Sequence, residues 1–228
     1  MKIMGVEKSS FIDYPGKICT VLFTGLCNFK CGYCHNSSVV KGLEKEINKE
    51  EVFAFLEKRK RFVDAVCISG GEPTIHEGLY DFIKEIKNRE FFIKLDTNGT
   101  NPEVLKKLID HELIDYVAMD IKSPLGKYKI VTGVQLDVED IRLSIDIIRN
   151  KAIDYEFRTT VCQELLTKDD ILEIAEYLKG SKKYYIQNFK DGANVLAGEK
   201  QFRPYNQETL EEIKKNIEGY FDIFEIRK

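Results

Sequence analysis

Short apolar runs rich in β-branched and aromatic residues alternate with longer amphipathic runs along the chain. Six of these apolar runs have the length of buried strands and end at polar or turn-forming residues. We therefore predict six strands, at residues 18–24, 65–69, 91–96, 116–122, 155–161 and 183–188.

The amphipathic runs between the strands predict helices. Asn48 and Glu51 have the spacing of a capping box, and Pro102 stands at the first helical position after Asn101. The predicted helices span residues 48–60, 101–110, 137–150, 167–179 and 207–219, and a short run at 220–228 ends the sequence.

This one-at-a-time alternation of strand and helix predicts an α/β fold with a mostly parallel sheet and right-handed crossovers. Six strand–helix units are too few for a complete eight-stranded barrel, so we expect a partial (β/α)6 barrel of the TIM type. No Gly/Ser-rich or Pro-rich linker interrupts the chain, which predicts a single domain over residues 1–228.

The predicted strands begin apolar and end polar. Because the carboxyl ends of parallel strands meet at one edge of a sheet, we expect a functional site there. Asp120 and Lys122 lie two residues apart, on one face of an otherwise apolar strand, although a plain ion pair would also explain them. The polar residues at the strand ends are Thr24, Ser69, Asp96, Lys122, Thr160 and Asn188.

Composition excludes several classes of partner. The net charge of −3 gives no electrostatic reason to expect nucleic acid or an anionic membrane as a partner. No apolar run approaches the roughly 20 residues of a membrane span, and the first residues lack the apolar core of a signal peptide. We therefore expect a cytoplasmic protein, whose cysteines are reduced and available for metal binding or catalysis.

Three of the six cysteines lie in one short segment, "CNFKCGYC", at positions 27, 31 and 34. A structural zinc site needs four ligands, and the nearest fourth candidate, His35, adjoins Cys34. A four-iron cubane takes one ligand for each iron, so three cysteines would leave one iron open to a substrate. We favour this cluster over zinc, and we expect the isolated Cys19, Cys67 and Cys162 to be ordinary buried residues.

This cysteine spacing resembles the CxxxCxxC signature of the radical S-adenosylmethionine superfamily. The resemblance implies one 4Fe–4S cluster held by Cys27, Cys31 and Cys34, with S-adenosyl-L-methionine bound at the open iron. "SGGEPT" at 69–74 resembles the family's GGEP motif, which implies that Gly70, Gly71 and Glu72 bind the amino group of that cofactor. A tight turn would be the purely structural interpretation of this motif.

Two further motifs, "LDTNGT" at 95–100 and "MDIKSP" at 119–124, resemble the glycyl-radical enzyme activating enzymes within that superfamily. In that branch the residues matching Asp96, Asp120 and Lys122 surround the methionyl carboxylate and a monovalent cation. Arg158 matches an arginine of the site, for which a structural ion pair is an equal alternative. The resemblance implies further cofactor contacts for Tyr33, His35, Ile121 and Asn188. Of these, Tyr33 would pack against the adenine. Some activating enzymes have a histidine where this chain has Gln187 and Asn188.

The segments "SSFIDYPGK" and "DIKSPLGKYKIVTGV" are most similar to anaerobic ribonucleoside-triphosphate reductase activating proteins, and pyruvate formate-lyase activating enzymes are related to them. The resemblance implies that the chain forms a glycyl radical on a separate partner enzyme, with flavodoxin or ferredoxin as electron donor. Two alternatives stay open. One is a radical enzyme that acts on a small molecule or a peptide, and the other is a non-enzymatic iron–sulfur electron carrier.

Overall fold

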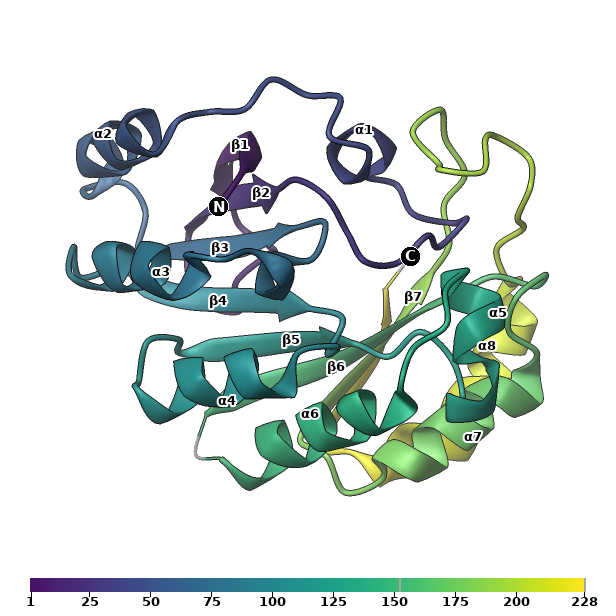
Figure 1. Cartoon of the computed structure of the whole chain (residues 1–228). Helices are drawn as coiled ribbons and strands as arrows, with labels where there is room; N and C mark the ends of the chain where they lie inside the picture. The colour runs from purple at the N-terminus through teal and green to yellow at the C-terminus, as the bar shows by residue number, and fades with distance from the viewer. Residues whose placement is uncertain (152, 228) are drawn as a thin grey trace.

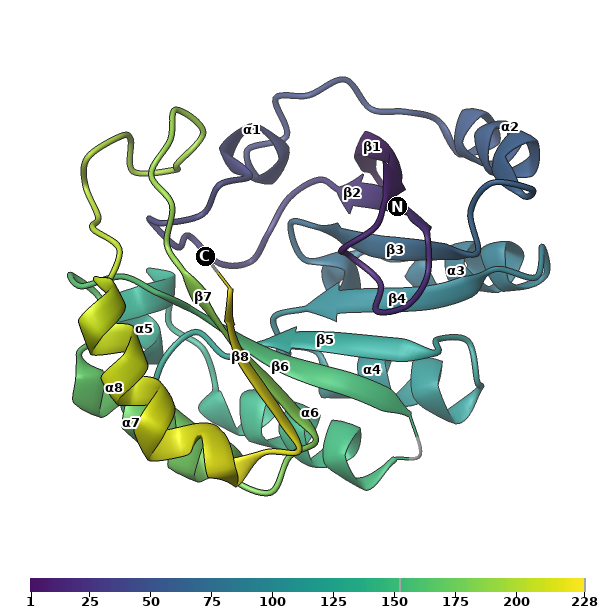
Figure 2. The ribbon, with the colours of Figure 1, turned by 180° about the vertical axis from the view of Figure 1, so that it is seen from behind.

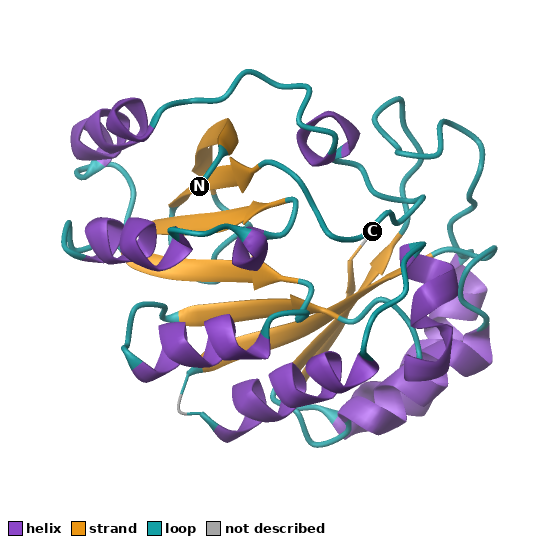
Figure 3. Cartoon of the chain, in the orientation of Figure 1, coloured by secondary structure: helices purple, strands orange, loops and turns teal. Residues whose placement is uncertain are grey.

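The computed structural model describes residues 1–151 and 153–227, and these form one eight-stranded sheet with helices packed on it (Figures 1 and 3). The strands are β1 (Ile3–Ser10), β2 (Cys19–Thr24), β3 (Ala65–Gly70), β4 (Phe92–Thr97), β5 (Tyr116–Asp120), β6 (Asp154–Val161), β7 (Lys183–Asn188) and β8 (Ile223–Arg227). The helices are α1 (Ser37–Val40), α2 (Lys49–Arg59), α3 (Leu79–Lys87), α4 (Pro102–Asp110), α5 (Tyr128–Thr132), α6 (Val138–Asn150), α7 (Lys168–Leu178) and α8 (Gln207–Ile217). Three 3₁₀ turns, η1 (Pro73–Ile75), η2 (Leu125–Lys127) and η3 (Glu218–Tyr220), complete the assignment.

The sheet confirms the predicted α/β fold and partial barrel. Its strand order is the order of the chain, and β2 to β8 are parallel to one another. The six predicted strands correspond to β2–β7. The strand predicted at 116–122 ends at Asp120, although the Ile121 amide still donates to the Arg158 carbonyl at 2.8 Å.

Two edge strands were not predicted. β1 pairs antiparallel with β2, and its exposed residues Glu7 and Lys8 break the apolar pattern of a buried strand. β8 lies within the run at 220–228, whose last residue, Lys228, is outside the described residues. No residue of β8 is fully buried, so this edge strand also lacks a strong apolar pattern.

The five predicted helices are present as α2, α4, α6, α7 and α8, and the helices α1, α3 and α5 were not predicted. The Asn48 side chain accepts from the Glu51 amide at 2.8 Å, which confirms the helix start expected there.

In Figure 1 the helices α3, α4 and α6 lie in front of the sheet, and Figure 2 shows its other, inner face. No helix in the described ranges has the length and apolar character that crossing a membrane requires.

The inner face of the sheet is filled at the amino ends of its strands. The loop 11–18, between β1 and β2, crosses this face (Figure 2) and places the Tyr14 ring 5.7 Å from the ring of Tyr116. Cys19 and Cys67 are buried in the same small apolar cluster, as predicted, and Cys162 is buried in the main core. The carboxyl-terminal half of the inner face is therefore the part that polar side chains occupy.

Candidate active site

A cavity of about 310 Å³ lies at the carboxyl ends of the strands, within the usual range of small-molecule sites. Residues that follow or end β2, β3, β4, β5, β6 and β7 line it. The structure brings the following predicted residues to this one cavity: Cys27, Cys31, Tyr33, Cys34, His35, Gly70, Gly71, Glu72, Asp96, Asp120, Lys122 and Arg158.

The three cysteines lie in the segment between β2 and α1, residues 25–36, called here the cysteine loop. A turn brings Cys31 and Cys34 close, because the Cys34 amide donates to the Cys31 carbonyl at 3.0 Å. Burial raises the pKa of the Cys27 thiol to about 12 and also raises the pKa of Cys31, against the opposing effect of Lys122. These thiols are therefore protonated unless a metal cation binds and displaces the protons, as thiolate–metal bonding does. Cys31 is buried and Cys27 and Cys34 are half-buried, and three such sulfur donors on one tight loop fit an iron–sulfur cluster.

The glycine pair 70–71 packs directly on the cysteine loop. The Gly71 amide donates to the Thr24 carbonyl at 2.8 Å, and the Glu72 amide donates to the Leu26 carbonyl at 2.9 Å. A Cβ atom at Gly71 would lie 1.6 Å from the Leu26 carbonyl oxygen, so no other residue fits there without moving the backbone. Gly70 also has a φ of 114°, which L residues rarely adopt.

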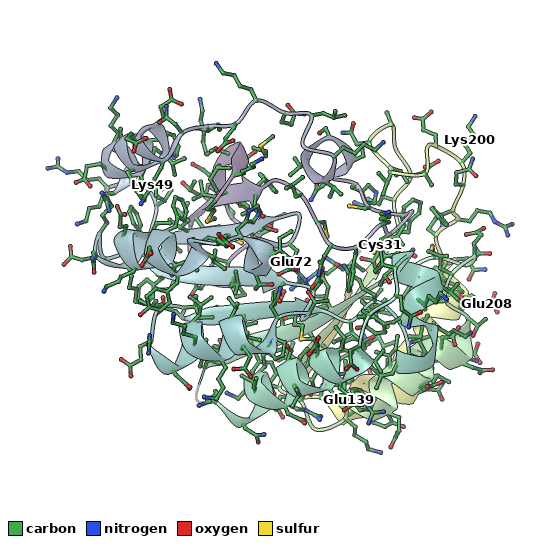
Figure 4. All side chains as sticks on the ribbon, viewed as in Figure 1. Cys31, Lys49, Glu72, Glu139, Lys200 and Glu208 are labelled. Atoms are coloured by element: carbon green, nitrogen blue, oxygen red, sulfur yellow. The ribbon has the colours of Figure 1, made fainter. Side chains whose placement is uncertain are left out.

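Glu72 is buried, and it connects this turn to the loop after β4. Its carboxylate accepts hydrogen bonds from the amide and hydroxyl of Thr74, from the Thr97 hydroxyl at 2.8 Å and from the Asn98 amide at 2.6 Å. Three of these bonds go to Oε1 and one goes to Oε2, so Oε2 keeps acceptor capacity. Glu72 therefore fixes the geometry of both loops and still lines the cavity. The position of Glu72 relative to Cys31 is seen in Figure 4.

Side-chain hydrogen bonds between Asn28, Asn98 and Thr100, which were not predicted from the sequence, connect the cysteine loop to the loop after β4. The Asn98 side chain donates to the Asn28 side chain at 2.8 Å, and Asn28 donates to the Thr100 hydroxyl at 2.8 Å. The motif "LDTNGT" therefore supports the cysteine loop as well as lining the cavity. Asn98-Gly99 is a common turn signal, and no local pattern indicates a partner 70 residues away.

The long connection between β7 and α8, residues 189–206, covers the cysteine loop from outside. The Leu196 amide donates to the Cys34 carbonyl at 2.8 Å, and the Ala197 amide donates to the Gly32 carbonyl at 2.9 Å. His35 also contacts this connection, through the Lys190 carbonyl and the Phe189 ring. Leu196 lines the cavity and was not predicted, because a leucine in a loop gives no local signal that it contacts the cysteine loop.

Five charged side chains alternate in sign across the inner face, and we call them the charged ladder: Lys94, Asp96, Arg158, Asp120 and Lys122. Arg158 joins the two carboxylates, at 3.3 Å from Asp96 and 2.8 Å from Asp120. Lys94 pairs with Asp96 at one end, and Lys122 lies 3.0 Å from Asp120 at the other. Lys94 is fully buried within its strand, and the sequence analysis did not select it.

Pairing outweighs burial in the charged ladder. Burial alone would raise the pKa of Asp120, but Arg158 and Lys122 hold it below the ordinary value. Burial alone would lower the pKa of Lys122, but Asp120 holds it well above the ordinary value. Lys122 shares its one carboxylate partner with Arg158, so its charge is incompletely balanced and an anionic group in the cavity would stabilise it. Arg158 forms the ion pairs of the structural alternative and also lines the cavity, and its role in cofactor binding stays a prediction.

Two predicted residues lie outside this cavity. Ile121 is buried and lines a different pocket beside α6 and α7, because its side chain alternates to the opposite face from Asp120. The Asn188 side chain is held by the backbone of Tyr205 through two hydrogen bonds of 2.9 Å. Asn188 lines an adjoining cavity of about 330 Å³, whereas its neighbour Gln187 lines both.

Comparison with known proteins agrees with the motifs. The model of the Radical SAM superfamily matches residues 21–178. A protein of Methanocaldococcus jannaschii named "Putative glycyl-radical enzyme activating enzyme" is 35% identical over 99% of this chain and 95% of its own length. The pyruvate formate-lyase-activating enzyme of Clostridium pasteurianum is 33% identical over 58% of this chain and 57% of its own.

Among solved structures, QueE from Escherichia coli matches 98% of this chain and 93% of its own with a TM-score of 0.56. The identity is 14%, so this likeness concerns the fold alone. Together with the strand order, it supports the partial barrel that the alternation of strands and helices predicted.

We expect Gly71→Ala to lower the free energy of unfolding by about 3 kcal/mol or more, the upper end of the range for overpacked sites. The added methyl group would overlap the Leu26 carbonyl, which belongs to the cysteine loop. Urea denaturation measures the loss. Gly219→Ala is the matched control, because nothing lies within 4 Å of a Cβ atom at that position. Equal midpoints for the two variants would contradict the close contact.

Proposed function

Because the chain belongs to the radical S-adenosylmethionine superfamily, we propose that it is an activating enzyme that forms a glycyl radical on a separate partner protein. The superfamily implies a 4Fe–4S cluster and S-adenosylmethionine. The observation that carries the proposal is the single cavity that holds all three cysteines of the CxxxCxxC segment together with four members of the charged ladder, Asp96, Arg158, Asp120 and Lys122. The relative named as an activating enzyme, which matches almost the whole chain, supports the same function.

In this proposal Cys27, Cys31 and Cys34 hold the cluster. The turn at 70–72 lies against the amino end of S-adenosylmethionine, and Lys122 binds its carboxylate. A cluster held there would supply the electron for reductive cleavage of S-adenosylmethionine, and the resulting radical chemistry would remove a hydrogen atom from a glycine of the partner. The chain's own residues supply binding and orientation, as is usual for cofactor-dependent radical chemistry.

The charged ladder prepares the carboxylate end of the site before any ligand arrives. Asp120 pairs with the Lys122 ammonium at 3.0 Å and is itself held by Arg158 at 2.8 Å, so little side-chain entropy of Lys122 remains to be lost on binding. We do not include a monovalent cation beside Asp96 and Asp120. Lys94, Arg158 and Lys122 already neutralise these carboxylates, which removes the reason for expecting such a cation.

We propose anaerobic ribonucleoside-triphosphate reductase as the partner and flavodoxin or ferredoxin as the electron donor. The partner rests on the segments "SSFIDYPGK" and "DIKSPLGKYKIVTGV", and the donor on the resemblance to activating enzymes. The other residues proposed to contact the cofactor are Tyr33, His35, Gly70, Gly71, Glu72 and Asp96, with Gln187 in place of Asn188.

Anaerobic incubation with the candidate reductase, S-adenosylmethionine and dithionite tests the function. We expect the doublet of a glycyl radical in the electron paramagnetic resonance spectrum, and no doublet with Cys31→Ala. Cleavage of S-adenosylmethionine without a doublet on any glycyl-radical enzyme would favour action on a small molecule or peptide. Absence of cleavage in a preparation with about four irons per chain would favour the electron carrier.

The three cysteines of the cysteine loop should be indispensable for iron binding. Cys27→Ala, Cys31→Ala and Cys34→Ala are each expected to abolish the brown absorbance after anaerobic reconstitution, because each removes one thiolate ligand. Cys19→Ala, Cys67→Ala and Cys162→Ala are the controls and should retain it, since these buried cysteines lie outside the cavity lining. A requirement for any of the controls would contradict the three-cysteine assignment.

Lys122→Ala should leave the cluster intact and weaken binding of S-adenosylmethionine by about ten- to a hundredfold. This is the effect of losing one charge-assisted hydrogen bond of roughly 1.5–3 kcal/mol. Calorimetric titration of cluster-loaded protein measures it. Lys127→Ala is the matched control, because Lys127 pairs with Asp170 and is outside the cavity lining. Equal affinities for both variants would make the Asp120–Lys122 pair purely structural.

A further inference from the structure

The main chain leaves the sheet at Lys122, shortly after the end of β5. The preceding amide, of Ile121, still donates to the Arg158 carbonyl at 2.8 Å. Within residues 1–151 and 153–227 no main-chain carbonyl accepts from the Lys122 amide, which donates instead to the Tyr128 hydroxyl at 3.2 Å. Because main-chain amides shielded from water are nearly always hydrogen-bonded, the Tyr128 side chain replaces the strand ladder at this point.

This bond bears on the site because Lys122 lines the cavity together with the cysteines. The Lys122 ammonium lies 3.0 Å from the Asp120 carboxylate. The ion pair fixes the end of the Lys122 side chain, and the bond from the Lys122 amide to Tyr128 fixes the main chain from which that side chain extends. Lys122 is thus held at two points.

Residues 122–128 form a turn that Tyr128 completes. The Ser123 hydroxyl and the Lys127 amide both donate to the Pro124 carbonyl at 2.9 Å. Tyr128 is buried, so its hydroxyl reaches the Lys122 amide from within the core. Loss of that hydroxyl would leave the first amide of the turn without its acceptor, whereas the other two bonds would remain.

Tyr128 also packs on the cysteine loop. Its ring meets the Phe29 ring edge-on with the centroids 6.5 Å apart, and Phe29 lies between the first two cysteines of that loop. At the other end of α5 the Thr132 carbonyl accepts from the Lys30 amide at 2.8 Å. Tyr128 therefore connects the main chain at Lys122 to the loop that carries the sulfur donors.

We propose that Tyr128 is a positioning residue for S-adenosylmethionine, whose hydroxyl holds the main chain at Lys122 so that the ammonium faces the carboxylate of the ligand. The inference rests on the proposed function and assigns a role to a residue outside the cavity lining. Without the hydroxyl, residues 121–127 would populate conformations in which the ammonium lies elsewhere, and the affinity would fall with the binding-competent fraction. The alternative is that the Tyr128 hydroxyl contributes to stability alone.

Tyr128→Phe tests the proposal, because it removes the hydroxyl and keeps the buried ring. We expect calorimetric titration of the cluster-loaded variant to show binding of S-adenosylmethionine about two- to tenfold weaker than in the parent, which is the effect of one hydrogen bond between neutral groups. Tyr155→Phe is the matched control. The Tyr155 hydroxyl accepts from the Lys182 amide at 3.1 Å, and neither residue lines the cavity. This control should keep the parent's affinity.

A double-mutant cycle with Lys122→Ala shows whether Tyr128 acts through Lys122. In the Lys122→Ala background, Tyr128→Phe should weaken binding no further. Decarboxylated S-adenosylmethionine, which has no group for Lys122 to bind, should bind equally to the parent and to Tyr128→Phe. Additive losses in the cycle, or equal losses for the two ligands, would make the role of the hydroxyl purely structural and overturn the inference.

Hydrogen exchange of the metal-free chain gives a readout that needs no cluster. The Lys122 amide should be protected in the parent and should exchange faster in Tyr128→Phe, because its acceptor is lost. An unprotected Lys122 amide in the parent, or an unchanged affinity of Tyr128→Phe for S-adenosylmethionine, would overturn this inference alone. Failure of the cluster-loaded parent to bind S-adenosylmethionine would overturn the proposed function and this inference with it.

Discussion

The backbone contact between Gly71 and Leu26 determines where the cysteine loop lies. A Cβ atom at Gly71 would stand 1.6 Å from the Leu26 carbonyl, so the two loops approach as closely as backbones can. Since the Glu72 amide donates to the same carbonyl, the turn after β3 and the loop after β2 form one unit. Glu72 then extends this unit to the loop after β4 through Asn98. Three consecutive strand ends are thereby fixed relative to the cysteines.

The charged ladder provides the second fixed part of the site. Alternation of sign lets five buried or half-buried charges exist on the inner face, because each carboxylate lies between two cations. Such an arrangement tolerates little displacement, since breaking one pair would leave an uncompensated charge in a poorly solvated place. The cavity is therefore bounded by ion-paired charged side chains on the sheet and by the sulfur donors of the cysteine loop.

Sequence patterns predicted the buried strands and the helix starts, because these depend on residues that are close together in the chain. The runs that became β2–β7 are apolar because both faces of those strands are covered, and Asn48 and Pro102 mark helix starts by backbone chemistry alone. The edge strands β1 and β8 are partly exposed, so their sequences lack that signal. Lys94 is a single charged residue within an apolar strand, and the network that joins it through Asp96 to Arg158 depends on the alignment of β4, β5 and β6. The Asn28–Asn98 hydrogen bond and the bond from the Leu196 amide to the Cys34 carbonyl join residues far apart in the chain. Hydrophobic periodicity does not predict such contacts.

The segment at residues 189–206 that packs over the cysteine loop is synthesised late. Each strand pairs with its neighbour in the chain, so the order of the strands across the sheet is also the order of their synthesis. Cys27, Cys31 and Cys34 emerge early, whereas the backbone of Leu196 and Ala197 that shields them is synthesised after more than two thirds of the chain. The residue that completes the cavity wall, Leu196, is therefore the last of the lining residues to be synthesised, and until then the carbonyls of Gly32 and Cys34 lack its segment's two amide donors.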